Sequence, residues 1–175
     1  MDLPGATYLF SLATLSVTFV GFSALVIVFR QTIGGEMSRL EVLITRIFIQ
    51  LGFMVTASAM LPPLLALFDL PPPLIWRLAS LAGAIPSFLF AVTYPARRRA
   101  ASGVATPLRI WLDILVLLTA VAVLAWNVVG IGITPGPGPF AAGLTIILFL
   151  SGWAYLQALR MLLGHHLSRL DRREP

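Results

Sequence analysis

The feature that most constrains this chain is a series of long apolar stretches separated by short polar or proline-rich connections. They cover residues 8–29, 40–61, 74–94, 108–131 and 140–163. Each reaches the roughly 20 residues that a helix needs to cross the hydrocarbon core of a bilayer. Backbone polar groups must be paired internally in lipid, and the pattern lacks the alternation of a barrel, so these stretches predict helices. The expected fold is all-α: a polytopic integral membrane protein, a single domain built as a bundle of five transmembrane helices.

The composition agrees with this expectation and excludes several classes of protein. Hydrophobic residues make up 58% of the 175 residues and charged residues only 11%, whereas a soluble domain carries about 25% charged residues. The mean hydropathy is +0.94. A soluble enzyme, a nucleic-acid-binding domain and a disordered chain are therefore excluded. The chain has no cysteine, which excludes disulfides, thiol catalysis and cysteine-based metal sites.

Local signals predict where several of these helices begin and end. Ser38 and Glu41 form an S-x-x-E capping box at the start of the second helix. The proline pair 62–63 is expected to end or sharply kink that helix, and Pro95 to close the third. The Thr-Pro dipeptide at 106–107 is typical of an N-cap followed by a first-turn proline, and predicts the start of the fourth helix.

The distribution of arginine predicts the orientation in the membrane. Eleven of the twelve basic residues, all arginine, lie in or near the segments 30–39 and 97–109 and the C-terminal tail, while Arg77 alone belongs to the other side. The positive-inside rule then places the N-terminus outside and the C-terminus in the cytoplasm. The first apolar stretch is too long for a signal-peptide core and predicts a retained span. Arginine without lysine suits a GC-rich bacterial genome, so we expect the bacterial inner (plasma) membrane.

The same arginines suggest one partner. Residues 164–175 are expected to form a basic amphipathic tail on the inner side of the membrane. Together with the arginines after the third span, this tail would form a ring of positive charge, which we call the basic collar. Such a collar attracts anionic lipid head groups, and nucleic acid is not an expected partner because the basic residues flank the spans. The residues assigned to this lipid contact are Arg97, Arg98, Arg99, Arg169, Arg172 and Arg173.

Small and polar residues in the first span predict a packing surface. Ser11, Thr14, Thr18 and Gly21 are spaced by three, four and three residues and therefore share one helix face. Small residues let helix backbones approach closely in membranes. We expect this face to lie inside the bundle or at a contact between subunits of a homo-oligomer. The alternative interpretation is that such a face lines a polar path.

Ionisable residues inside the spans give a second candidate site. Arg46 and Asp113 lie at similar depth near the inner boundary of two different helices, and Gln50 is one turn beyond Arg46. An isolated charge in the membrane is costly, so we expect Arg46 to pair with Asp113, with Arg109 and Glu41 as competing partners. The pair either stabilises packing or serves as an ion or proton relay or a head-group site. If it forms, single substitutions should destabilise the protein and the double change should recover part of the loss.

The remaining polar positions point to packing rather than to chemistry. Asn127, near the outer end of the fourth span, is expected to make an interhelical hydrogen bond rather than to act as a selectivity residue. Arg77 should either extend to the interface or meet Asp69. No catalytic constellation, cofactor motif or metal-ligand spacing is present in the sequence. An enzyme is therefore not expected.

Two functions remain open at this point. The first is a small membrane-embedded interaction or accessory protein, favoured by the small-residue faces and the short loops. The alternative is an oligomeric channel or transporter protomer for an ion, proton or small solute, favoured by Arg46, Gln50, Asp113 and Asn127. Exposure of these polar side chains to a water-filled groove would favour transport, and a dry ion pair would favour packing.

Overall fold

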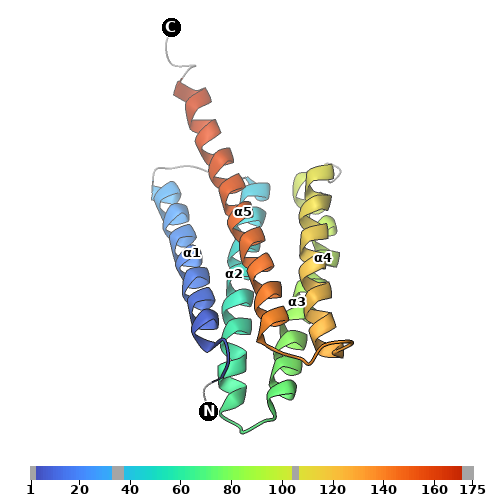
Figure 1. Ribbon diagram of the computed structural model, residues 1–175. Helices are drawn as coiled ribbons and strands as arrows, with labels where there is room; N and C mark the ends of the chain where they lie inside the picture. Colours follow the sequence, from blue (N-terminus) through green and yellow to red (C-terminus); the bar gives the residue numbers. More distant parts are fainter. Residues whose placement is uncertain (1–2, 33–37, 104–106, 171–175) are drawn as a thin grey trace.

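The computed structural model describes residues 3–32, 38–103 and 107–170, including all side chains in these ranges except those of residues 26, 29–31 and 158–170. Within this part the chain is all-α, with no strand. Its five helices run alternately in opposite directions (Figure 1). Each is long and apolar enough to cross a membrane, as expected of a multi-pass membrane protein. Their bounds are α1 Ala6–Thr32, α2 Arg39–Ala66, α3 Pro72–Ser102, α4 Leu108–Val129 and α5 Pro137–Leu170.

The helices form a bundle in which α1 occupies an edge. Helix α1 packs against α2 and α5, whereas α2, α3, α4 and α5 pack around a common core. We call the end where α1 and α3 finish and α2 and α4 begin the arginine-rich end, because Arg39, the segment 97–99 and Arg109 lie there. Helix α5 starts at the opposite end and extends beyond the rest of the bundle at the arginine-rich end (Figure 1). Its helical backbone reaches Leu170, so most of the predicted basic tail continues this helix.

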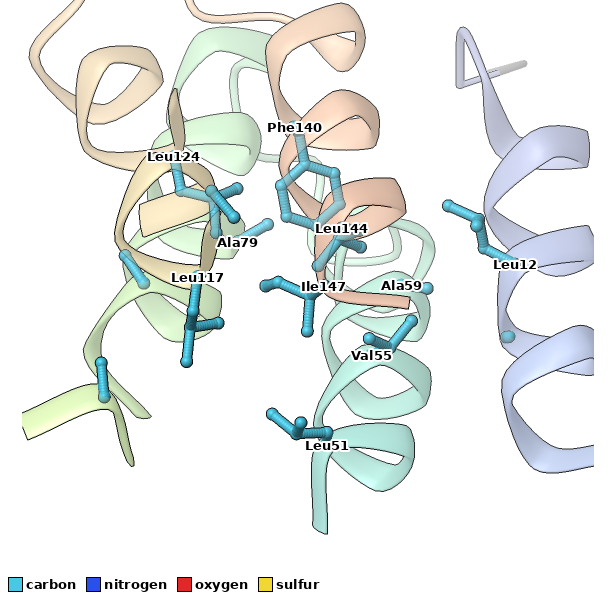
Figure 2. Packing of buried hydrophobic residues seen from close by; sticks show 14 of the residues in the cluster. Leu12, Leu51, Val55, Ala59, Ala79, Leu117, Leu124, Phe140, Leu144 and Ile147 are labelled. Carbon is cyan, nitrogen blue, oxygen red and sulfur yellow. The ribbon is translucent and has the colours of Figure 1, made fainter. Parts of the chain in front are cut away.

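The core is built from medium-sized apolar side chains of all five helices. Figure 2 shows side chains of α4 facing those of α5, with side chains of α2 completing the layer. The rings of Trp76 and Phe140 lie 5.7 Å apart, and both side chains are buried. In a membrane such contacts stabilise the fold through close packing, since lipid tails are as apolar as the residues they replace. Fully buried members of the core are Val55, Ala59, Ala79, Ala120, Leu124 and Phe140.

Large apolar side chains also cover the outside of the bundle. Phe22, Phe53 and Phe149 are each more than half exposed. A soluble monomer rarely exposes contiguous apolar patches beyond a few hundred Å², whereas a lipid-facing surface requires them. Further exposed apolar residues come from every helix: Leu15, Leu64, Leu89, Leu112, Leu115 and Leu156.

Two glycines permit the closest helix contacts. A Cβ atom on Gly143 of α5 would lie 2.7 Å from Cγ of Leu124 and 3.4 Å from the carbonyl oxygen of Ala120, both on α4. A Cβ atom on Gly52 of α2 would collide with Cγ2 of Val20 on α1. Only glycine therefore fits at these two crossings without movement of the facing side chain or of the helix that carries it.

Hydrogen bonds from its side chains attach α1 to both of the helices that it contacts. The Ser16 hydroxyl on α1 donates to the carbonyl oxygen of Gly52 on α2 at 2.7 Å, and this serine is completely buried. Tyr8 on α1 and Thr145 on α5 share a hydrogen bond of 2.7 Å between their hydroxyl groups. The edge helix is thus attached to each of its two neighbours by a polar contact.

The capping prediction for α2 is confirmed. The Ser38 backbone N–H donates to Glu41 Oε2 at 2.8 Å, and the Glu41 N–H donates to Ser38 Oγ at 3.3 Å. Helix α4 begins at Leu108 with Pro107 itself as the N-cap, so the proline precedes the first turn instead of occupying it. Thr106 lies outside the described residues.

The expected stop at Pro95 was wrong, and of the two outcomes expected at the proline pair 62–63, a stop or a sharp kink, the stop does not occur. Helix α2 continues through the pair 62–63 to Ala66, and α3 continues through Pro95 to Ser102. A proline inside a helix removes one hydrogen bond but keeps a helical φ, so a helix held by tertiary packing can pass through it. Helix α3 ends instead at Gly103, whose φ of 66° is left-handed and whose N–H donates to the Arg99 carbonyl.

Candidate functional site

A carboxylate lies inside the bundle near the arginine-rich end. Asp113, in the second turn of α4, is partly buried and lines a cavity of about 50 Å³ between α2, α3, α4 and α5. Among the described side chains, Asp113 is the one charged member of the lining of this cavity. The other lining residues are Ile47, Leu51, Phe90, Ala91, Tyr94, Ile114, Leu117, Leu150, Trp153 and Ala154.

Positive charges surround this carboxylate on two sides. Arg109, one turn earlier on α4, and Arg98 of α3 are the charged groups that act on Asp113, and the side-chain amide of Gln157 on α5 stands beside it. The guanidinium carbon of Arg109 lies 5.3 Å from the ring centre of Trp153, a cation–π distance. Residues of three helices therefore converge on Asp113.

Two buried donors near this cluster have no acceptor in the described part of the chain. They are Nε of Arg98 and Nε2 of Gln157. Buried donors of this kind are normally satisfied by protein groups or by ordered water, and the cavity beside Asp113 is large enough for a few water molecules. The arrangement therefore brings a carboxylate, two guanidinium groups and an amide together beside a space large enough for water.

The expected Arg46–Asp113 pair does not form. Arg46 is exposed, Gln50 is partly exposed, and Arg46 is not among the charged groups acting on Asp113. Each helical residue is rotated by about 100° from the previous one. Ile47 and Leu51 line the cavity, so the residues that immediately precede them face another direction. Of the two competing partners, Arg109 is beside Asp113, while the Glu41 carboxylate accepts the Ser38 N–H at the start of α2.

Asn127 makes the interhelical contacts that the sequence predicted. Its side chain is completely buried, and its Nδ2 donates to the Ser80 hydroxyl on α3 at 2.8 Å and to the Gly136 carbonyl at 3.2 Å. The Gly136 N–H donates back to Asn127 Oδ1 at 3.0 Å. One side chain of α4 thus joins α3 and the connection that leads into α5.

The predicted packing face of α1 does not point into the bundle. Ser11, Thr14, Thr18 and Gly21 are all exposed. The three hydroxyls donate to carbonyls one turn earlier in their own helix, at 2.8–3.0 Å, so they need no partner from another helix. The inward face of α1 consists of Leu9, Leu12, Ala13, Ser16, Val20 and Ser23. Because this face does not lie inside the bundle, a contact between subunits stays as the second part of the prediction.

The basic collar is described only in part. Arg97 and Arg99 are exposed and Arg98 is partly buried. The Arg169 side chain and residues 172–173 lie outside the described residues. All three of these arginines were assigned to the lipid contact. Arg98 instead turns toward Asp113, while Arg97 and Arg99 face outward.

Sequence reasoning did not identify the residues that complete the Asp113 cluster. Arg98 belongs to a run of three arginines, and nothing in that run indicates which one turns inward. Gln157 offered the better signal, since it is an amide in an otherwise apolar span at a depth similar to that of Asp113. Over the described residues, no three His, Cys, Asp or Glu side chains are grouped so that they could hold a metal ion.

Comparison with known proteins adds no functional assignment. No family model matches the chain, and no curated protein or solved structure is significantly similar to it.

Proposed function

We propose that this chain is a small membrane-embedded interaction or accessory protein, which acts by binding other membrane components. The observation that carries the proposal is the closed apolar layer beyond the Asp113 cavity. Leu124, Phe140 and Leu144 are at most 1% exposed and fill the space between α4 and α5 (Figure 2). A single chain with this packing offers solutes no continuous polar route, while its outer faces present a broad apolar surface to lipid or to partner helices.

The orientation is part of the proposal. We place the arginine-rich end in the cytoplasm, the N-terminus outside and the protein in a bacterial plasma membrane, with anionic lipids around the collar. Each collar arginine near the surface would contribute about 1 kcal/mol to attraction of anionic lipid. Arg39, Arg97, Arg99 and Arg109 support this orientation, because all four are exposed at one end of the bundle.

A pair of C-terminal fusions tests the orientation. We expect a green fluorescent protein fused after residue 175 to fluoresce and an alkaline phosphatase at the same position to be inactive, since the first needs the cytoplasm and the second the outer side. A phosphatase fused after residue 133, in the connection between α4 and α5, should be active and is the matched control. An active C-terminal phosphatase with an inactive one at 133 would reverse the assignment.

Vesicle flux measurements separate the accessory function from transport. Purified protein in liposomes should pass protons, K⁺, Na⁺ and Cl⁻ no faster than protein-free liposomes, because the apolar layer blocks the single chain. The Asp113→Asn variant should give the same background rate. Mass measurement of the detergent-solubilised protein, made on the same sample, should show more than one copy, as expected for contacts through outer helix faces.

The alternative function predicts a different result. If copies of this chain together form a channel or transporter, flux should exceed the background, and Asp113→Asn should abolish it without changing the oligomer mass. That outcome would replace the accessory function with transport through a path between subunits.

A further inference from the structure

A second, larger cavity lies at the opposite end of the bundle. It is formed where the start of α1 meets the end of α2, and these segments lie together at that end in Figure 1. Its volume is about 460 Å³, within the roughly 300–1,000 Å³ range of small-molecule sites. Its lining residues are Leu3, Ala6, Thr7, Pro63, Ala66, Leu67 and Asp69.

The α2 side of this cavity is electronegative. Asp69 is exposed and is the one charged residue that the described part of the chain contributes to the lining. Its φ of 51° is left-handed, a conformation that aspartate tolerates better than most residues. Arg77, the basic residue that the described part of the chain has at this end, is exposed, lies outside the lining and forms no ion pair with Asp69. The C-terminus of α2 adds the negative end of its dipole.

The α1 side of the cavity offers donors. The Ala6 N–H donates to the Leu3 carbonyl and the Leu9 N–H to the Gly5 carbonyl, but the intervening N–H groups of Thr7 and Tyr8 have no backbone acceptor among the described residues. The Thr7 hydroxyl is exposed and, unlike those of Ser11, Thr14 and Thr18, makes no hydrogen bond within the described chain. The positive end of a long helix dipole therefore faces the cavity together with a free hydroxyl.

We propose that this cavity binds the zwitterionic head group of an ethanolamine phospholipid. The ammonium group would lie against Asp69 and the phosphate near the first turn of α1, so that each charge of the ligand meets the opposite polarity. The cavity lies at the ends of two membrane-spanning helices, the level at which lipid head groups sit. Leu3, Pro63 and Leu67 supply an apolar wall for the glycerol and the upper acyl chain.

The lining also discriminates between head groups. Proteins recognise a choline ammonium chiefly with cages of aromatic rings, and none of the described lining residues is aromatic. A primary ammonium carries three N–H donors for a carboxylate, which choline lacks. A lipid with a net negative charge would find no basic side chain among the described lining residues. Binding at this site is independent of the Asp113 cavity, which lies at the other end of the bundle.

Native mass spectrometry with matched lipids tests the proposal. Phosphatidylethanolamine and phosphatidylcholine with identical acyl chains are compared, because both are net neutral and the basic collar does not separate them electrostatically. The wild-type protein should retain the ethanolamine lipid about tenfold better, which corresponds to about 1.4 kcal/mol. Asp69→Asn should remove this preference, and Arg77→Gln, a charge change at the same end outside the cavity, should leave it unchanged.

A steric variant tests the site without altering its charge. Ala66→Phe should fill the cavity and lower retention of the ethanolamine lipid about tenfold, while Ala57→Phe, on an exposed position of the same helix, should not. Helix content and thermal unfolding of each variant identify any that fail to fold. Equal retention of the two lipids by the wild-type protein, or a preference that survives both Asp69→Asn and Ala66→Phe, would overturn the proposal.

Discussion

Replacing Asn127 by leucine is expected to lower the free energy of unfolding by about 2–4 kcal/mol, although leucine has a similar size and suits an apolar interior. The asparagine side chain is completely buried and makes three hydrogen bonds, two of them to the backbone of Gly136. Leucine would leave the Gly136 N–H and carbonyl without these partners at the entrance to α5. Both of these hydrogen bonds are partly buried, and a polar group shielded from water without a partner is costly.

Ser80→Ala is the matched control for this prediction. It removes the hydroxyl that accepts from Asn127 but leaves the two bonds to Gly136 intact, so we expect a loss of at most about 1 kcal/mol. Reversible unfolding in mixed micelles, followed by circular dichroism, measures both variants. Equal losses for Asn127→Leu and Ser80→Ala would mean that the Gly136 contacts contribute nothing to stability.

Gly52→Leu is expected to separate α1 from α2 and to destabilise the protein by about 3 kcal/mol or more. Even a Cβ atom at this position collides with Val20, and a leucine must also displace the buried Ser16, whose hydroxyl donates to the Gly52 carbonyl. Both Val20 and Ser16 belong to the inward face of α1. Thermal unfolding measured by circular dichroism should therefore shift strongly to lower temperature.

Gly21→Leu, the same substitution on the exposed face of α1, is the control. A Cβ atom on Gly21 meets nothing within 4 Å, so stability of the single chain should change by no more than about 0.5 kcal/mol. If the exposed face of α1 is a contact between subunits, this variant should reduce the oligomer mass while the fold stays intact. An unchanged mass would show that subunits associate through another surface, and equal destabilisation by both variants would contradict the packing of α1.

The contrast between these two glycines shows where prediction from the sequence failed. Ser11, Thr14 and Thr18 share a face with Gly21, and this polar stripe was assigned to packing. Their hydroxyls are satisfied by carbonyls of their own helix, so polarity did not require them to face inward. The inward hydroxyls are those of Ser16 and Ser23, and the Ser16 hydroxyl has a carbonyl of another helix as its acceptor. Only the position of α2 distinguishes this serine from its neighbours.

The same reasoning applies to the charged cluster. The sequence predicted the depth of Asp113 near the arginine-rich end from its position in the span. It also offered Arg109 as a partner, because Arg109 lies one helical turn before Asp113. The choice between Arg46 and Arg98 depended on how α2 and α3 are rotated about their axes. Residues adjacent in sequence differ by about 100° around a helix, so depth alone does not decide which arginine reaches the carboxylate.

By itself the sequence determined the number, approximate position and class of the helices, the arginine-rich end and the capping box at Ser38 and Glu41. These features depend on local or one-dimensional properties, namely the length of apolar segments, the charge of the connections and contacts within one helical turn. The tertiary structure alone decided which face of α1 is buried, that α2 and α3 run through their prolines, and that Arg98 lies beside Asp113. These features depend on contacts between helices, whose rotation is set by how their side chains fit together and not by the order of residues within any one of them.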